Sequence, residues 1–92
     1  MSLLRRRTPV QLVTLVTRTG CHLCELAHPV VEQAAADAGV RFEVLDVDAD
    51  LAPMTDAASW SDKVPVVLLD GVEHAYWQVD RKALRRALGL RV

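Results

Sequence analysis

The chain alternates between segments with the pattern of strands and segments with the pattern of helices. Four segments are rich in apolar residues on one or both faces of an extended backbone, which predicts strands. These strands are expected at residues 10–17, 40–48, 64–69 and 72–77. The first carries apolar residues on both faces, as a strand inside a sheet does. Asp70-Gly71 is a tight-turn signal, so the last two strands should form a hairpin.

Helical spacing of apolar residues begins at the first cysteine and continues to residue 38. The predicted apolar face consists of Leu23, Leu26, Ala27, Val30, Val31, Ala34 and Ala38. Thr19-Gly20 offers an N-cap for this helix, and Gly39 a stop. A short helix is expected over residues 50–59. A last helix should begin at Asp80, its N-cap, and end before Gly89.

The resulting order of elements is βαβαββα, which indicates an α/β fold with a four-stranded mixed sheet flanked by helices. Because a helix connects the first two strands, these should be parallel with a right-handed crossover. No repeats or linkers interrupt the pattern, so we expect one domain over residues 10–92. Residues 1–9 form a basic N-terminal segment that need not belong to the fold.

Composition limits the function classes. In 92 residues, 51% are hydrophobic and 25% charged, which is typical of one small globular domain. No stretch approaches the roughly 20 apolar residues that span a bilayer. The net charge of -1 argues against binding of nucleic acid. The basic start is not followed by the pattern of a signal peptide. We therefore expect a cytoplasmic protein, a monomer, with no membrane or nucleic-acid partner.

The two cysteines, Cys21 and Cys24, are the candidate catalytic residues. A Cys-x-x-Cys pair beside a βαβ pattern is typical of a redox motif. At a helix start, unpaired N–H groups and the helix dipole favour a thiolate, so Cys21 should be the nucleophile. Cys24, one turn further in, should attack the resulting mixed disulfide. His22 lies between them and, when protonated, would favour the thiolate further.

The two cysteines could also bind zinc, attach haem or form an inert pair. Two cysteines cannot complete a four-cysteine zinc site, and a mixed site would need Cys21 and Cys24 together with His28 and His74. Covalent haem attachment requires a histidine after the second cysteine, where Glu25 stands. A pair of cysteines without redox activity would not need to lie at the N-terminus of a helix. We therefore expect no metal.

Several separated features together resemble the thioredoxin superfamily, and most of all its small bacterial glutaredoxin-like proteins. The resemblance extends from about Val10 to Leu90. It depends on Thr19-Gly20-Cys21-His22-Leu23-Cys24, on Pro29 in the following helix, on Val64-Pro65 at the third strand and on Gly71 in the hairpin.

This resemblance implies a thioredoxin-like fold of the glutaredoxin type and a thiol–disulfide oxidoreductase. Its substrates would be protein disulfides or glutathione mixed disulfides, with no tightly bound cofactor and with glutathione as a co-substrate. Pro65 would be a cis-proline facing the disulfide, and the backbone of Val64 would pair with the substrate. Arg18 and Asp80 match positions that bind glutathione.

The chain also departs from the family pattern. The dipeptide between the cysteines is His22-Leu23, and Tyr76-Trp77 stands where glutaredoxins carry glycines, which weighs against glutathione binding. Tyr76, Trp77 and Trp60 could flank the active-site groove, although packing is the expected role. The alternative function is a non-catalytic thioredoxin-fold module that binds a protein partner or a metal.

Overall fold

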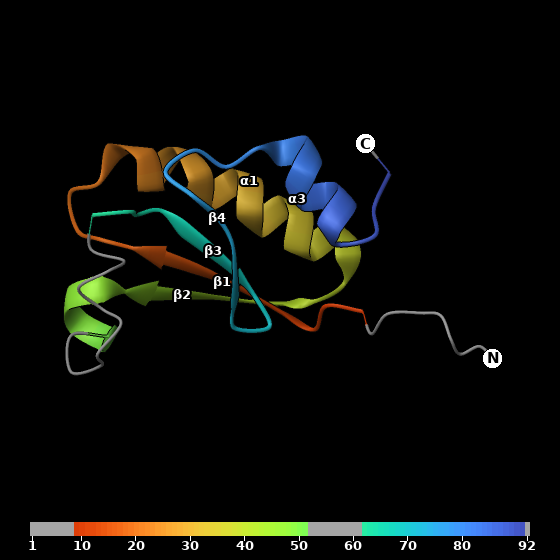
Figure 1. Ribbon diagram of the computed structural model, residues 1–92, viewed down its shortest axis with the longest axis horizontal. Coiled ribbons are helices and arrows are strands. Elements are labelled where there is room, and N and C mark those ends of the chain that lie inside the picture. The colour runs from red at the N-terminus through yellow and green to blue at the C-terminus, as the bar shows by residue number, and fades with distance from the viewer. Residues whose placement is uncertain (1–8, 52–61, 92) are drawn as a thin grey trace.

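The computed structural model of the protein describes residues 9–51 and 62–91 (Figure 1). Its elements are β1 (Leu12–Thr17), α1 (His22–Ala38), β2 (Arg41–Asp46), a π-helical turn η2 (Val47–Leu51), β3 (Val66–Leu69), β4 (Val72–Tyr76) and α3 (Arg81–Ala87). This order confirms the predicted succession of the four strands and of the first and last helices. The short helix predicted over residues 50–59 lies largely outside the described residues.

The strands form one four-stranded sheet in the order β2-β1-β3-β4. β1 and β2 are parallel, whereas β1–β3 and β3–β4 are antiparallel, so the predicted mixed sheet and hairpin are confirmed. The hairpin turn places Asp70 at φ 51° and Gly71 at φ 85°. Positive φ at both central residues matches the right-handed twist of the two strands.

The main core lies between the sheet and the two helices α1 and α3, which cover the same face (Figure 1). Its buried members are Val13, Leu15, Ala27, Val31, Ala34, Ala35, Val67 and Leu84. A smaller cluster occupies the opposite face and consists of Val16, Val47, Val66 and Leu68. Because β1 contributes to both clusters, it is buried on both sides, as predicted, and it fixes the position of the loop that follows it.

Helix α1 differs from the prediction at its start and on its apolar face. Its N-cap is Cys21 rather than Thr19, because the Cys21 side chain accepts the N–H of Cys24. Leu23 and Leu26 were predicted to be on the core face but are 45% and 57% exposed. The sheet and α3 cover a narrower stripe of the helix, which consists of Cys24, Ala27, Val31, Ala34 and Ala35.

Five strand ends also differ from the prediction; two of them are the starts of β1 at Leu12 and of β2 at Arg41, which lie one or two residues later than predicted. β2 ends at Asp46, because this carboxylate accepts the N–H groups of Asp48 and Ala49 and turns the chain. β3 begins at Val66, after Val64-Pro65. β4 ends at Tyr76, because Trp77 adopts a left-handed φ of 65°. The end of β2 is therefore set by local hydrogen bonds, and the end of β4 by a backbone conformation.

Helix α3 begins as predicted. The Asp80 carboxylate accepts the N–H groups of Lys82 and Ala83 at 2.9 and 3.1 Å, which confirms Asp80 as the N-cap. An ion pair between Arg85 and Asp37, 2.7 Å long, joins α3 to the end of α1. The helices in the described part of the chain are too short or too polar to cross a membrane.

Candidate active site

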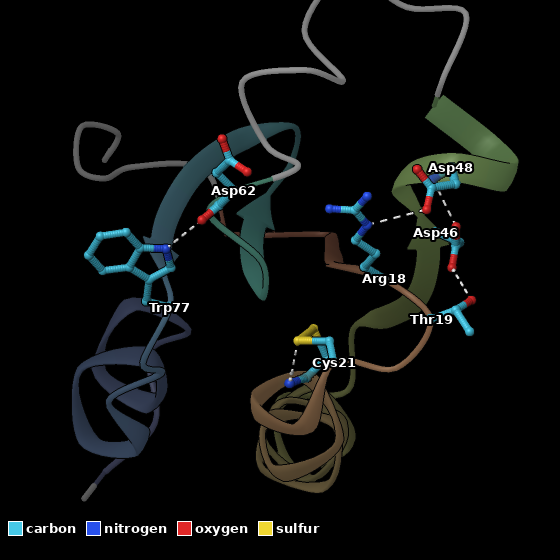
Figure 2. The surroundings of a disulfide bond; sticks show 8 residues. Arg18, Thr19, Cys21, Asp46, Asp48, Asp62 and Trp77 are labelled. Carbon is cyan, nitrogen blue, oxygen red and sulfur yellow. Dashed lines mark hydrogen bonds and ion pairs between the residues drawn. A yellow bond between two sulfur atoms is a disulfide. The ribbon is translucent and has the colours of Figure 1, made fainter.

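Cys21 and Cys24 form a disulfide at the N-terminus of α1, with their Cα atoms 5.2 Å apart (Figure 2). Cys21 is the N-cap and has an extended backbone, at φ -93° and ψ 108°. Its Sγ accepts a hydrogen bond of 3.1 Å from the backbone N–H of Cys24. A sulfur that carries negative charge would be stabilised by the same N–H and by the helix dipole.

The two sulfur-bearing residues differ in exposure. Cys24 is buried, with 4% of its surface exposed, whereas Cys21 is only half-buried. A molecule that approaches from solvent therefore has better access to Cys21 than to Cys24. This asymmetry suits a pair in which one sulfur attacks a substrate and the other resolves the intermediate.

On one side of the disulfide lies a hollow of about 620 Å³, here called the Trp77 hollow, within the roughly 300–1,000 Å³ typical of ligand sites. It is lined by Leu23, Asp62, Val64, Tyr76, Trp77 and Gln78. The peptide bond between Val64 and Pro65 is cis, and Pro65 is buried. Val64 is half-buried and borders the hollow.

Trp77 is tied to the segment that precedes β3. Its indole N–H donates to the carbonyl of Asp62 at 2.9 Å, and its backbone N–H donates to the carbonyls of Lys63 and Pro65 at 3.1 and 2.9 Å. Its ring also meets Tyr76 edge-on, with centroids 5.2 Å apart. Even so, Trp77 is 54% exposed, so its side chain forms a wall of the hollow. The sequence-based expectation that Trp77 packs in the core is therefore wrong.

On the other side of the disulfide lies a second hollow, lined by both cysteines, Arg18, Glu25, His28 and Asp46 among others. Figure 2 shows Arg18 and Asp46 on this side, opposite Trp77. Arg18 pairs with Asp48 at 3.3 Å. The pKa of Asp46 is held below its ordinary value of 3.8, mainly by the hydrogen bond from the Ala49 N–H. This carboxylate also accepts from the Thr19 hydroxyl at 3.3 Å.

The structure thus brings the predicted residues Arg18, Cys21 and Cys24 to one hollow, and places Val64 and Pro65 beside the other. His22 is exposed on the first turn of α1. The Asp80 carboxylate is occupied as an N-cap.

Two contributions to the site were not predicted from the sequence. They are the exposure of Leu23 and the hydrogen bonds of Trp77. A sequence signal existed only for Trp77, as a bulky residue where the resembled family carries glycine.

The described residues offer no cluster of metal ligands. Within residues 9–51 and 62–91, no three His, Cys, Asp or Glu side chains are grouped so that they could hold a metal ion. The geometry therefore gives no support to the alternative zinc site with His28 and His74.

Comparison with known sequences identifies a family. The model of the glutaredoxin-like domain (DUF836) matches residues 12–89. Uncharacterized proteins of Mycobacterium bovis and Mycobacterium tuberculosis are 39% identical to the chain over 77 residues. The matched region covers 79% of this chain and 77% of each relative.

Comparison with solved structures identifies the fold. A mutant thioredoxin from Halobacterium salinarum is similar with a TM-score of 0.60 and 25% identity, over 84% of this chain and 70% of that one. Thioredoxin 1 from Thermosipho africanus gives a TM-score of 0.60 and 20% identity, over 86% of this chain and 96% of that one. These likenesses confirm the predicted thioredoxin-like fold.

Proposed function

The chain belongs to the family of glutaredoxin-like domains, and we propose that it is a thiol–disulfide oxidoreductase whose redox centre is Cys21–Cys24. One observation carries this proposal. The sulfur of Cys21, a half-buried residue, accepts the N–H of Cys24 at the start of α1, while Cys24 itself is buried. A pair used only for stability would need neither the more accessible Cys21 nor the helix start.

The reaction begins with both cysteines reduced. The Cys21 thiolate attacks one sulfur of a substrate disulfide, so a Cys21–substrate disulfide forms and the substrate S–S bond breaks. The departing substrate sulfur leaves as a thiolate and takes a proton from solvent. The N–H of Cys24 stabilises the Cys21 thiolate before this attack.

Cys24 completes the cycle. Its thiol loses a proton and attacks the Cys21 sulfur, which forms the Cys21–Cys24 disulfide and expels the second substrate thiolate. The substrate has then gained two electrons, and the protein has lost them. A dithiol or a pair of glutathione molecules restores the reduced state.

Around this centre we assign substrate binding to Val64, which lines the Trp77 hollow, and to Pro65, which follows it through a cis peptide bond. Arg18, in the second hollow, is a candidate for an anionic group of the substrate, and it pairs with Asp48 in this state. His22 is a candidate for tuning Cys21, because it is adjacent to it at the helix start. Asp80 is the weakest candidate, because its carboxylate caps α3.

A redox titration tests the proposal. The protein is equilibrated in buffers of reduced and oxidised dithiothreitol, alkylated, and its modified cysteines are counted by mass spectrometry. One reversible two-electron transition is expected, and the Cys21→Ser variant should show none. The proposed oxidoreductase activity is wrong if the wild-type cysteines do not form a reversible disulfide. It is also wrong if Cys21 does not react with iodoacetamide at pH 7.

A second candidate is a non-catalytic module that holds a protein partner. It is favoured by the exposed apolar residues Leu23 and Trp77, which would serve binding without any redox chemistry. Stable binding to a partner by a protein whose cysteines are inert would support it. Stoichiometric zinc in the purified protein would favour a metal-binding version.

The electron donor and the compartment belong to the same proposal. A dithiol centre of this kind works where thiols are kept reduced, as in a cytoplasm. Reduction by glutathione and its reductase, compared with reduction by thioredoxin reductase, identifies the donor.

A further inference from the structure

We propose that the Trp77 hollow binds an apolar side chain next to the disulfide of a protein substrate, and that it thereby selects protein disulfides over glutathione mixed disulfides. This inference rests on the proposed oxidoreductase function and names its substrate class. Trp77 is the residue that determines the selection.

The exposed apolar surface of the described residues is concentrated here. Six large hydrophobic residues of this part of the chain are exposed, and four of them are Leu23, Leu26, Tyr76 and Trp77. Leu23 and Trp77 line both the Trp77 hollow and a groove that continues along α1 past Leu26. Leu23 lies between the two cysteines in the chain, so this apolar surface begins at the helix turn that carries the disulfide.

The wall of the hollow is held in place before any substrate arrives. Trp77 keeps a left-handed φ of 65°, a conformation that bulky residues rarely adopt. Hydrogen bonds to the carbonyls of Asp62, Lys63 and Pro65 hold it there. A fixed aromatic wall loses little freedom on binding, so it favours a substrate whose apolar side chain fits against it.

Charge disfavours glutathione in the same place. The polar lining of the hollow consists of Asp62 and Gln78. The nearby ammonium of Lys63 is bound to Glu73 at 2.9 Å and lies 4.4 Å from the centre of the Tyr76 ring. Glutathione is a net anion, because its carboxylates outnumber its single ammonium group. It would bring carboxylates towards Asp62 and give the apolar wall no side chain to cover it.

Two disulfide-linked peptides test the selection. They are identical except that the cysteine is flanked on both sides by leucine in one and by glutamate in the other, and oxidised glutathione is the third substrate. The reduced protein should react with the leucine peptide about tenfold faster than with the other two, a difference of about 1.4 kcal/mol.

Matched variants locate the effect. Trp77→Gly removes the wall and suits the left-handed backbone, so the preference for leucine should fall to near unity. Val72→Ala removes an exposed apolar side chain at the other end of β4, in the hairpin, and should keep the wild-type preference. Leu26→Gln alters the continuing groove and should lower the rate with the leucine peptide only.

Peptide binding to a variant that lacks both cysteines tests this inference separately from the proposed function. In a protein with Cys21→Ser and Cys24→Ser, and with Trp60→Phe so that Trp77 is the remaining tryptophan, the leucine peptide should change the fluorescence and the glutamate peptide should not. If no disulfide reacts with the wild-type protein but the leucine peptide binds, the proposed oxidoreductase activity is wrong, whereas the Trp77 hollow is still a binding site for apolar side chains. If disulfides react but Trp77→Gly keeps the wild-type preference, or no leucine peptide binds, the inference is overturned.

Discussion

The backbone N–H of Cys24 donates a hydrogen bond to the Sγ of Cys21, 3.1 Å away, across the first turn of α1. The same contact is the N-cap of the helix, so one sulfur atom serves both the fold and the chemistry. A serine hydroxyl can reproduce the cap but not the nucleophile. Structure and reactivity at this position can therefore be separated by substitution.

Replacing the buried cysteine should trap the reaction halfway. In Cys24→Ser the Cys21 thiolate still attacks a substrate disulfide, but no second thiol is present to expel the substrate. A mixed disulfide with near-stoichiometric yield is expected by mass spectrometry under non-reducing conditions. The Cys21→Ser protein is the control, and if it traps substrate through Cys24 instead, the assignment of the nucleophile is wrong.

Replacing Cys21, the more accessible cysteine, should separate capping from reactivity. Cys21→Ser and Cys21→Ala both lack the disulfide and the nucleophile, but only serine can accept the Cys24 N–H. The serine variant should exceed the alanine variant in free energy of unfolding by about 1 kcal/mol. Urea denaturation followed by circular dichroism measures the difference, and equal stabilities would mean that the cap contributes nothing.

The N-cap of α3 offers a prediction about stability alone. Asp80 accepts the N–H groups of Lys82 and Ala83, so Asp80→Ala should lower the free energy of unfolding by about 1 kcal/mol. Asp80→Asn keeps an acceptor and should lose much less. A variant that instead keeps its stability and loses its rate with glutathione substrates would show that Asp80 acts in binding.

Acid should weaken the contact between the helices. The hydrogen bond from Arg85, and after it that from Gln33, lowers the pKa of Asp37 below its ordinary value of 3.8. The unfolded chain therefore binds more protons than the folded protein near and below that pH. The stability due to this carboxylate is present above pH 3.8 and is lost as the pH falls through the folded pKa.

The Asp37→Asn variant checks this prediction. It should unfold at a lower temperature than the wild type at pH 7, and the gap should narrow as the pH falls below 3.8. Thermal unfolding across pH 2 to 7 measures the gap. A constant gap would mean that the charge of Asp37 does not stabilise the fold.

Local sequence patterns predicted much of the fold. The Asp70-Gly71 hairpin and the Asp80 cap were predicted, because each depends on residues close in sequence. The parallel β1–β2 pair was predicted because a helix connects the two strands. The position of the cysteines at the helix start was predicted for the same reason. The fold class then followed from the order of elements.

The walls of the site depend on contacts between distant segments, and local patterns do not encode these. Leu23 and Leu26 follow the helical apolar pattern, but the sheet covers only part of that face and leaves both exposed. The left-handed φ of Trp77 accompanies hydrogen bonds to residues 62–65, more than ten positions away. No local preference of a tryptophan indicates such a conformation.

The proposed reaction requires that Cys21 is an activated nucleophile. The pH dependence of Cys21 alkylation is the direct measure of this activation. The reduced protein is treated with iodoacetamide over a range of pH, and the rate at Cys21 is followed by mass spectrometry, with Cys24→Ser as a control that isolates this thiol. The pKa of Cys21 should lie below that of a free cysteine, about 8.5, because the Cys24 N–H and the helix N-terminus stabilise the thiolate. A Cys21 pKa at or above the free value would contradict this activation.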